Sequence, residues 1–167
     1  MRHPTSHRFL KKENLMPTIT KPIYLYHGSP CLFPTVEPRT ACGDGVTQTD
    51  MLTGIYAYEK FSWVIPFALP IRWYPDEPGG KRSFSCEAGK TYIEYGTLNP
   101  DGVGDVYRLP ADCFERVDEN QWLSRVPVTP DCIIPIRVRD YLPAITFSPQ
   151  AQKLQNLLYG TKEQGAT

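Results

Sequence analysis

Residues 23–30 have the sequence IYLYHGSP, a strand-like alternation that ends at a histidine followed at once by a glycine. Successive side chains of a strand point to opposite faces, so we expect Ile23, Leu25 and His27 to share one face. An imidazole there, beside a glycine whose backbone can approach a ligand closely, predicts a binding site at His27 and Gly28. The alternative is an ordinary strand end, in which the Gly-Ser-Pro sequence forms the turn.

A second strand is predicted at residues 54–59, which have the sequence GIYAYE. Aromatic and β-branched residues dominate it, as is typical of strands. Its alternation places Ile55 and Ala57 on one face and Tyr56 and Tyr58 on the other. This second strand therefore brings two tyrosine rings to one side of the predicted sheet.

A short helix is expected directly after this strand, within the aromatic and apolar residues 60–69. Ser62 is its expected N-cap, and its expected buried face carries Trp63 and Phe67, with Pro66 at the edge. Pro66 would shorten or kink this helix, because proline lacks the backbone N–H that an internal helical turn requires.

Together these segments resemble the ADP-ribosyltransferase superfamily, specifically its poly(ADP-ribose) polymerase branch and the small bacterial rifampin ADP-ribosyltransferases. The resemblance rests on the sequence HGS at residues 27–29 and GIY at residues 54–56, and it covers roughly residues 22–70. These short motifs are moderately specific. The resemblance implies a fold in which two small sheets form a cleft that holds NAD as the substrate.

In that superfamily the histidine hydrogen-bonds the ribose next to the nicotinamide, the glycine backbone contacts the carboxamide, and a tyrosine stacks on the nicotinamide ring. The resemblance assigns these roles to His27, Gly28 and Tyr56 of this chain, with Ser29 assisting. Tyr58, on the predicted face of Tyr56, is included in the expected NAD-binding set. The resemblance therefore predicts His27 and Tyr56 as two of the catalytic residues.

The chain departs from the family pattern at two positions. Phe67 stands where the polymerase type has a second stacking tyrosine, so the ring is kept and the hydroxyl is lost. Gln121 stands where similar small bacterial and phage proteins have an acid before a tryptophan, and an amide cannot supply the charge of a carboxylate. Glu119 would share a strand face with Gln121 if this segment is extended, so both are candidates for the third catalytic position. A polar turn before a buried Trp122 is the alternative.

The rest of the chain predicts further strands, at residues 91–95, 106–110 and 131–142, and a turn at 112–117 that carries Phe114 to the core. Pro135 indicates an edge position for the last strand. A final helix is expected at residues 149–158, capped by Ser148, with an apolar face formed by Ala151, Leu154, Leu157 and Leu158. We therefore predict an α+β fold with two small, mostly antiparallel sheets that form a cleft and a few short helices.

Composition limits the classes of function. The 18 basic residues balance the 18 acidic residues, so no basic field recruits nucleic acid. No segment has the length and apolarity of a membrane span or a signal peptide. The five cysteines include no Cys-x-x-Cys pair and the histidines add no metal motif, which predicts a cytoplasmic protein without a metal. We expect one domain at residues 18–160, between a flexible leader at 1–17, in which Met16 is an alternative start, and a frayed tail at 161–167.

The expected function is transfer of ADP-ribose from NAD to an acceptor, which the sequence does not identify as protein, nucleic acid, small molecule or water. A catalytically inactive nucleotide- or protein-binding module, of phage or mobile-element origin, is the second hypothesis, and Gln121 and Phe67 favour it. A small β-rich interaction protein in which the motifs are coincidental is the third.

Overall fold

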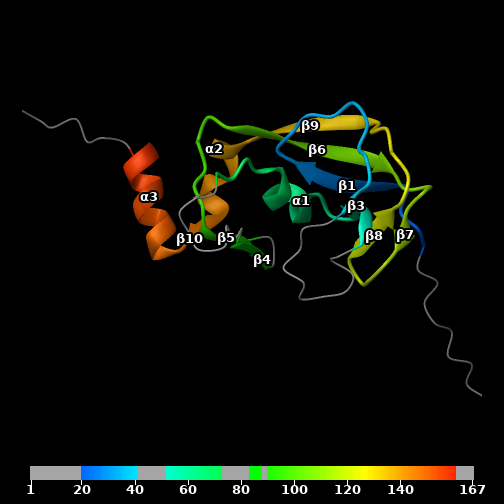
Figure 1. The fold of residues 1–167 in the computed structure, drawn as a ribbon, viewed down its shortest axis with the longest axis horizontal. Helices are drawn as coiled ribbons and strands as arrows, with labels where there is room; N and C mark the ends of the chain where they lie inside the picture. The colour runs from blue at the N-terminus through cyan, green and yellow to red at the C-terminus, as the bar shows by residue number, and fades with distance from the viewer. Residues whose placement is uncertain (1–19, 41–51, 73–82, 88–89, 161–167) are drawn as a thin grey trace, which may run out of the picture.

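The computed structural model describes residues 20–40, 52–72, 83–87 and 90–160. The fold is a small α+β fold with short helices and two mostly antiparallel sheets, as predicted (Figure 1). The predicted leader at 1–17 and tail at 161–167 lie outside the described residues. Within the described part, no helix is long and apolar enough to cross a membrane.

The larger sheet has seven strands and contains both of the segments that carried the resemblance. Its strands are β1 (Tyr24–Ser29), β2 (Arg39–Thr40), β3 (Thr53–Tyr58), β6 (Val103–Pro110), β7 (Glu115–Arg116), β8 (Gln121–Ser124) and β9 (Cys132–Arg137). Their order is β7-β8-β3-β1-β6-β9, and β2 pairs with β3. The strand that contains His27 is therefore central, between β3 and β6. Pro135 lies on the edge strand β9, as its missing N–H predicts.

The smaller sheet has three strands in the order β10-β5-β4. They are β4 (Ser83–Glu87), β5 (Lys90–Tyr95) and β10 (Ile145–Phe147). The strand predicted at 91–95 corresponds to β5. The sequence analysis did not predict β10, which is three residues long and pairs in parallel with β5. So short a strand gives too few alternating positions for a sequence pattern to reveal it.

The helix α1 (Phe61–Ala68) packs against β1, β3 and β6 of the larger sheet and also contacts β4 of the smaller one. Glycines on β1 and β6 allow the close approach, because a Cβ at Gly28 would overlap the carbonyl oxygen of Val64 and one at Gly104 would overlap that of Ala68. The helix thus lies with its backbone directly on the larger sheet, between the two sheets (Figure 1).

Two details of the prediction for α1 were wrong. The helix begins at Phe61 after Lys60, without a side-chain cap, so Ser62 is not the N-cap. Its buried residues are Val64, Ile65, Pro66 and Ala68, whereas Trp63 is half-buried and Phe67 is 42% exposed. Gly28 and Gly104 leave room for the α1 backbone on the sheet. The side of α1 that faces the sheet is therefore the side that carries Val64 and Ala68.

The two faces of the larger sheet bury separate apolar clusters. We call the first the histidine face; it carries Leu25, His27, Ser29, Ile55, Ala57, Tyr107 and Leu109. The opposite side, which α1 covers, we call the helix face; it carries Tyr26, Gly28, Tyr56, Tyr58 and Val106. The predicted alternation of both strands is thereby confirmed, except that Ile23 precedes β1 and is 77% exposed.

The C-terminal segment differs from the prediction at the end of its strand. The strand β9 ends at Arg137, and Val138 begins a short helix, α2 (Val138–Tyr141), which the 3-10 helix η2 (Leu142–Ala144) follows. Val138 is fully buried, so the apolar alternation that predicted a strand to residue 142 continues into a helix. Phe114, at 1% exposure, reaches the core as predicted.

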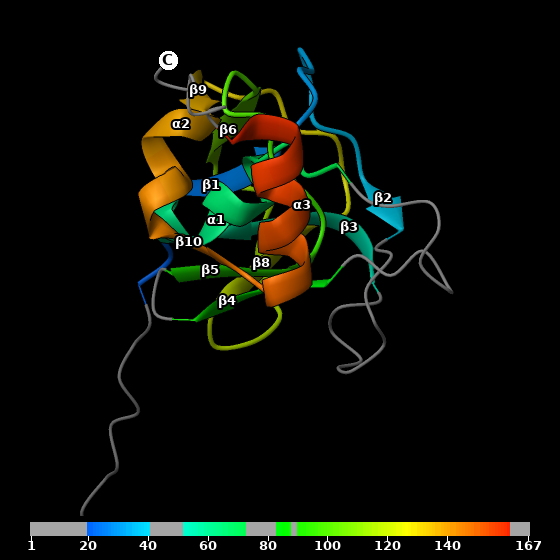
Figure 2. The ribbon, with the colours of Figure 1, turned by 90° about the vertical axis from the view of Figure 1, so that its left-hand side faces the viewer.

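The last helix, α3 (Pro149–Tyr159), lies at the end of the molecule opposite β7 and β8 (Figures 1 and 2). Ser148 caps it as predicted, with its hydroxyl accepting from the Ala151 N–H at 3.1 Å. The predicted apolar face is only partly right, because Leu157 is 77% exposed and Leu158 is 50% exposed. The buried Gln155 docks the helix instead: its amide accepts from the Leu98 N–H at 2.8 Å and donates to the Leu98 carbonyl at 2.7 Å.

Candidate functional site

His27 is held at the point where its strand separates from β3. Its Nδ1 lies 2.8 Å from the carbonyl oxygen of Tyr56. A carbonyl only accepts, so Nδ1 carries the hydrogen and Nε2 of the neutral ring is left as an acceptor. Within the described part of the chain, Nε2 has no hydrogen-bond partner. The side chain is therefore oriented through one nitrogen and can contact a ligand through the other.

The separation of the two strands is visible in their register. All residues of β1 pair with β6, from Tyr24 opposite Pro110 to Ser29 opposite Asp105. Across the described residues of β1 and β3, by contrast, one pair is formed, Tyr26 opposite Tyr58. The His27 side chain binds the Tyr56 carbonyl just beyond this pair. A side chain thus bridges the two strands where backbone pairing stops.

The imidazole is kept neutral by its surroundings. Burial lowers the pKa of His27 below its ordinary value of 6.5, because an apolar environment disfavours the charged form. The positive charge of Arg39 lowers this pKa as well, and the hydrogen bond to the Tyr56 carbonyl opposes both effects. His27 is consequently suited to accepting a hydrogen bond at neutral pH and not to acting as a cation.

Tyr107 anchors the chain that follows β1 above the histidine face. Its hydroxyl donates to the Cys31 carbonyl at 2.7 Å and accepts from the Phe33 N–H at 2.8 Å. Its ring stacks on Phe33 at 6.3 Å and lies 6.1 Å from the His27 ring. Burial raises the pKa of Tyr107 above its ordinary value of 10.0, so the hydroxyl keeps its proton.

Ser29 and Asp105 lie side by side at the end of this face. Ser29 is buried, and its hydroxyl accepts from the Cys31 N–H at 3.2 Å. The register places the half-buried Asp105 directly opposite it. Side chains opposite each other across strands share a face, so Asp105 shares the face of His27. The sequence analysis did not single out Asp105, since only the register of β1 with β6 brings it there.

Gly28 has a packing role that the sequence analysis did not anticipate. It lies on the helix face, where the N–H nitrogen of Ala68 would be 2.9 Å from a Cβ at this position. Its alpha carbon is therefore covered by α1. The glycine that the resemblance assigns to carboxamide binding is also required by the contact between helix and strand.

Tyr56, Tyr58 and Phe67 lie on the helix face. The Tyr56 hydroxyl accepts from the Leu52 N–H at 2.8 Å and lies 3.2 Å from the Leu52 carbonyl. Tyr58 stacks on Phe67 at 6.0 Å, and Phe67 meets Phe84 edge-on at 5.3 Å. The structure thus joins Tyr58 and Phe67 in one aromatic cluster. The rings of Tyr56 and His27, by contrast, lie on opposite faces of the sheet, and the His27 ring contacts Tyr56 through its backbone carbonyl.

The two candidates for the third catalytic position are separated. The strand β8 begins at Gln121, whose amide donates to the Tyr58 hydroxyl at 3.3 Å. Glu119 is exposed and lies in the bend before this strand, so the two do not share a strand face as the extended alternative required. Asp118 causes the bend, because its carboxylate accepts from the N–H groups of Asn120 and Gln121. Gln121 alone joins the other predicted residues.

Arg39 is a second residue near His27 that the sequence analysis missed. It pairs with Gly54 across β2 and β3, and its guanidinium carbon lies 4.7 Å from the centre of the Phe33 ring. No local sequence pattern predicts a role for Arg39, because its position depends on the path of the chain between β1 and β2, which the sequence does not predict. Its proximity to His27 follows from the pairing of β2 with β3.

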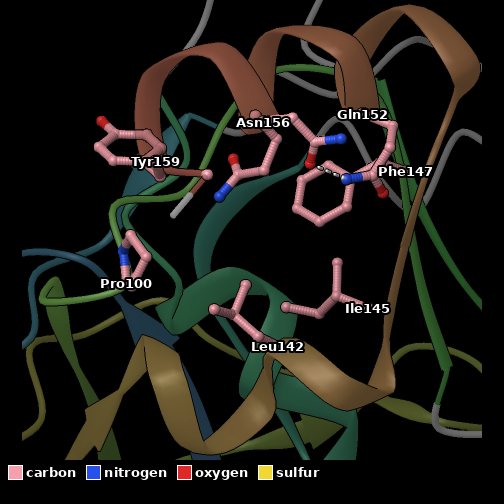
Figure 3. A pocket seen from close by; sticks show the side chains of 9 residues that line it. Pro100, Leu142, Ile145, Phe147, Gln152, Asn156 and Tyr159 are labelled. Carbon is pink, nitrogen blue, oxygen red and sulfur yellow. Dashed lines mark hydrogen bonds between the residues drawn. The ribbon is translucent and has the colours of Figure 1, made fainter. Parts of the chain in front are cut away.

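A separate hollow of about 260 Å³ lies between α3, η2 and β10 (Figure 3). Leu142, Ile145 and Phe147 face it from one side, and Gln152 and Asn156 from α3 on the other, joined by a 2.8 Å hydrogen bond (Figure 3). None of its lining residues is charged, and none belongs to the predicted site. The Tyr159 hydroxyl is its only titratable side chain, and no charged partner lines the hollow beside it.

Within the described residues, no three His, Cys, Asp or Glu side chains are grouped closely enough to hold a metal ion. No protein-family model, curated protein or solved structure matches the chain. Interpretation of the site therefore depends on its own geometry and on the sequence resemblance.

Proposed function

We propose that this protein binds NAD and transfers ADP-ribose to an acceptor, as an ADP-ribosyltransferase-type protein acting in the cytoplasm. The observation that carries the proposal is the orientation of His27, whose Nδ1 is fixed on the Tyr56 carbonyl where β1 and β3 separate. That arrangement leaves Nε2 as an acceptor for a ribose hydroxyl. The two-sheet fold with α1 between the sheets agrees with the architecture that the resemblance implies.

The proposed reaction breaks the bond between the nicotinamide nitrogen and the ribose, and the bonding electrons leave with nicotinamide. A nucleophilic atom of the acceptor then bonds to the same ribose carbon and loses its proton to solvent. In this scheme His27 orients the ribose, the Gly28 backbone holds the carboxamide, and Ser29 assists. Orientation of this kind accounts for much of the acceleration in such reactions. Tyr56 takes part through the carbonyl that fixes His27. Its ring lies on the helix face with Tyr58 and Phe67, away from a ligand at His27, so the stacking that the resemblance implies for these rings is not part of this scheme.

The neutral side chain of Gln121 is the feature on which the choice between an active transferase and an inactive binding module depends. Its amide donates to the Tyr58 hydroxyl on the helix face, and a neutral amide cannot offset the positive charge that develops as nicotinamide leaves. The neutral side chain supports a second candidate function, a nucleotide- or protein-binding module that holds its ligand without efficient transfer. Both candidates require a ligand at His27, so binding and chemistry need separate tests.

The binding test is a thermal-shift titration with NAD. A ligand that binds only the native state stabilises it by an amount that grows with the logarithm of the ligand concentration above the dissociation constant, so the wild type should show a concentration-dependent rise in melting temperature. His27→Ala should abolish the rise. His27→Asn is the informative variant, because its amide can still donate to the Tyr56 carbonyl but offers no Nε2; it should fold like the wild type and fail to respond. A wild type that shows no response to millimolar NAD would refute the proposal.

The chemistry test adds a carboxylate at the third position. Gln121→Glu is nearly isosteric and should raise the rate of nicotinamide release from NAD by at least roughly tenfold if electrostatic stabilisation is what the site lacks. Gln152→Glu, an exposed amide on α3, is the matched control and should have no effect. Release by the wild type would support transferase activity, with hydrolysis as transfer to water. Binding without release, even in Gln121→Glu, would support the module.

A further inference from the structure

Among the described residues, Arg39 is the cation whose charge acts on the candidate histidine. We infer that Arg39 binds the diphosphate group of the dinucleotide at the His27 site; this inference rests on the proposed function. In NAD the diphosphate is attached to the nicotinamide-side ribose. A residue that binds that ribose and a residue that binds the diphosphate must therefore be neighbours, as His27 and Arg39 are.

The pairing of strands fixes the place of Arg39. Arg39 lies opposite Gly54 on β3, two residues before the Tyr56 whose carbonyl holds His27. The β3 backbone thus lies beside both residues, and the contact of Arg39 with Phe33, whose ring stacks on Tyr107 next to His27, brings the guanidinium toward the histidine face. Their proximity is also electrostatic, because the charge of Arg39 lowers the pKa of His27.

The guanidinium is supported in a way that leaves its hydrogen-bond donors available. Its central carbon lies over the Phe33 ring, 4.7 Å from the ring centre. Arginine can stack through its planar face and still bind an anion through the N–H groups at its edge. Phe33 is itself held by Tyr107, through both the ring stack and the hydrogen bond to its backbone N–H. The arginine is therefore connected to the same network that surrounds His27.

No acidic side chain of the described residues neutralises Arg39. The ion pairs found there are Arg108 with Asp131 and Arg139 with Asp101. Arg39 is exposed and makes no side-chain hydrogen bond within the same part of the chain. A cation of this kind, beside a neutral histidine, is complementary to a diphosphate and not to a carboxamide or a ribose.

The test compares two ligands that differ in the diphosphate. Nicotinamide riboside contains the nicotinamide and its ribose but no phosphate, and NAD contains both phosphates. Calorimetric dissociation constants would be measured for the wild type, Arg39→Gln, Arg39→Lys and Arg137→Gln. The last variant is the matched control, since Arg137 is exposed at the end of β9.

Arg39→Gln should weaken NAD binding roughly tenfold or more, because a charge-assisted hydrogen bond is lost, and should leave riboside binding unchanged. Arg39→Lys should give an intermediate value, and Arg137→Gln should match the wild type. NAD binding by Arg39→Gln should also depend less steeply on salt concentration.

Two results would overturn the inference and leave the proposed function intact. One is equal weakening of NAD and riboside binding by Arg39→Gln, which would mean that Arg39 supports the site structurally. The other is unchanged NAD binding. A wild type that binds neither ligand would instead refute the proposed function, and this inference with it.

Discussion

The two faces of the larger sheet differ in what holds them together. On the helix face, α1 lies directly on β1 and β6, and contact depends on the absence of side chains at Gly28 and Gly104. On the histidine face, one hydrogen bond joins His27 to the Tyr56 carbonyl, two others join Tyr107 to the chain after β1, and the rings of His27 and Tyr107 lie 6.1 Å apart. Both faces bury apolar side chains, and they differ in what is added: close packing of backbone on backbone on the helix face, and side-chain hydrogen bonds on the histidine face.

This difference separates two neighbouring residues of a single sequence motif. His27 and Gly28 are adjacent, and the alternation of a strand sends them to opposite faces. The glycine positions a helix, whereas the histidine presents a nitrogen to a possible ligand. Changes at the two positions should consequently have different kinds of effect, the first on folding and the second on binding and pH dependence.

The largest effect is expected from Gly28→Ala. The added Cβ would overlap the Val64 carbonyl and approach the Ala68 nitrogen, and backbone atoms of a packed helix cannot move aside cheaply. We expect a loss of roughly 3 kcal/mol or more in the free energy of unfolding, measured by urea denaturation. Ser62→Ala, at an exposed position of α1, should change stability little. A Gly28→Ala protein as stable as the wild type would show that α1 does not rest on β1.

A smaller effect is expected from Tyr107→Phe on the histidine face. The change removes the hydroxyl that binds the Cys31 carbonyl and the Phe33 N–H, and keeps the buried ring. We expect a loss of about 1–2 kcal/mol in the same denaturation experiment. NAD binding, where present, should weaken too, because Phe33 supports Arg39. Tyr92→Phe on β5, which is exposed, is the control, and an equal loss there would contradict the network.

The comparison of faces also shows what the sequence predicts and what it does not. Alternation along β1 and β3 correctly separated His27 from its neighbours, because a period of two is a local property. The helix α3 was predicted for the same reason, from the Ser148 cap and a local apolar pattern. Local signals also existed where the prediction failed: the turn-forming Asp118 indicated that Glu119 would not be extended.

The rest of the site depends on contacts between residues distant in sequence. Asp105 meets Ser29 only through the register of β1 with β6, and Arg39 approaches His27 only because β2 pairs with β3. A local sequence pattern predicts neither register, because strand pairing depends on residues throughout the sheet. The exposure of Leu157 and Leu158 also depends on a contact between distant residues. The amide of Gln155 docks α3 on Leu98, so the helix does not need a continuous apolar face.

The smallest effect should come from the protonation of His27. Its pKa is lowered in the folded protein, so the unfolded chain binds a proton more readily as the pH falls through the ordinary value of 6.5. The free energy of unfolding should therefore decrease as the pH falls below about 6.5, until the pH reaches the folded pKa; one such group gives a slope of at most about 1.4 kcal/mol per pH unit. Tyr107 keeps its proton throughout this range, because burial raises its pKa above the ordinary value of 10.0.

The measurement is urea denaturation of the wild type and His27→Asn between pH 5 and pH 7.5, a range that spans the ordinary histidine pKa. His27→Asn keeps a donor for the Tyr56 carbonyl and cannot titrate, so the difference between the two proteins isolates the imidazole. The histidines outside the described residues are present in both proteins, and their contributions cancel. A difference that stays constant with pH would mean that His27 titrates normally. The histidine face would then be open to water at His27, and its contrast with the closely packed helix face would be lost.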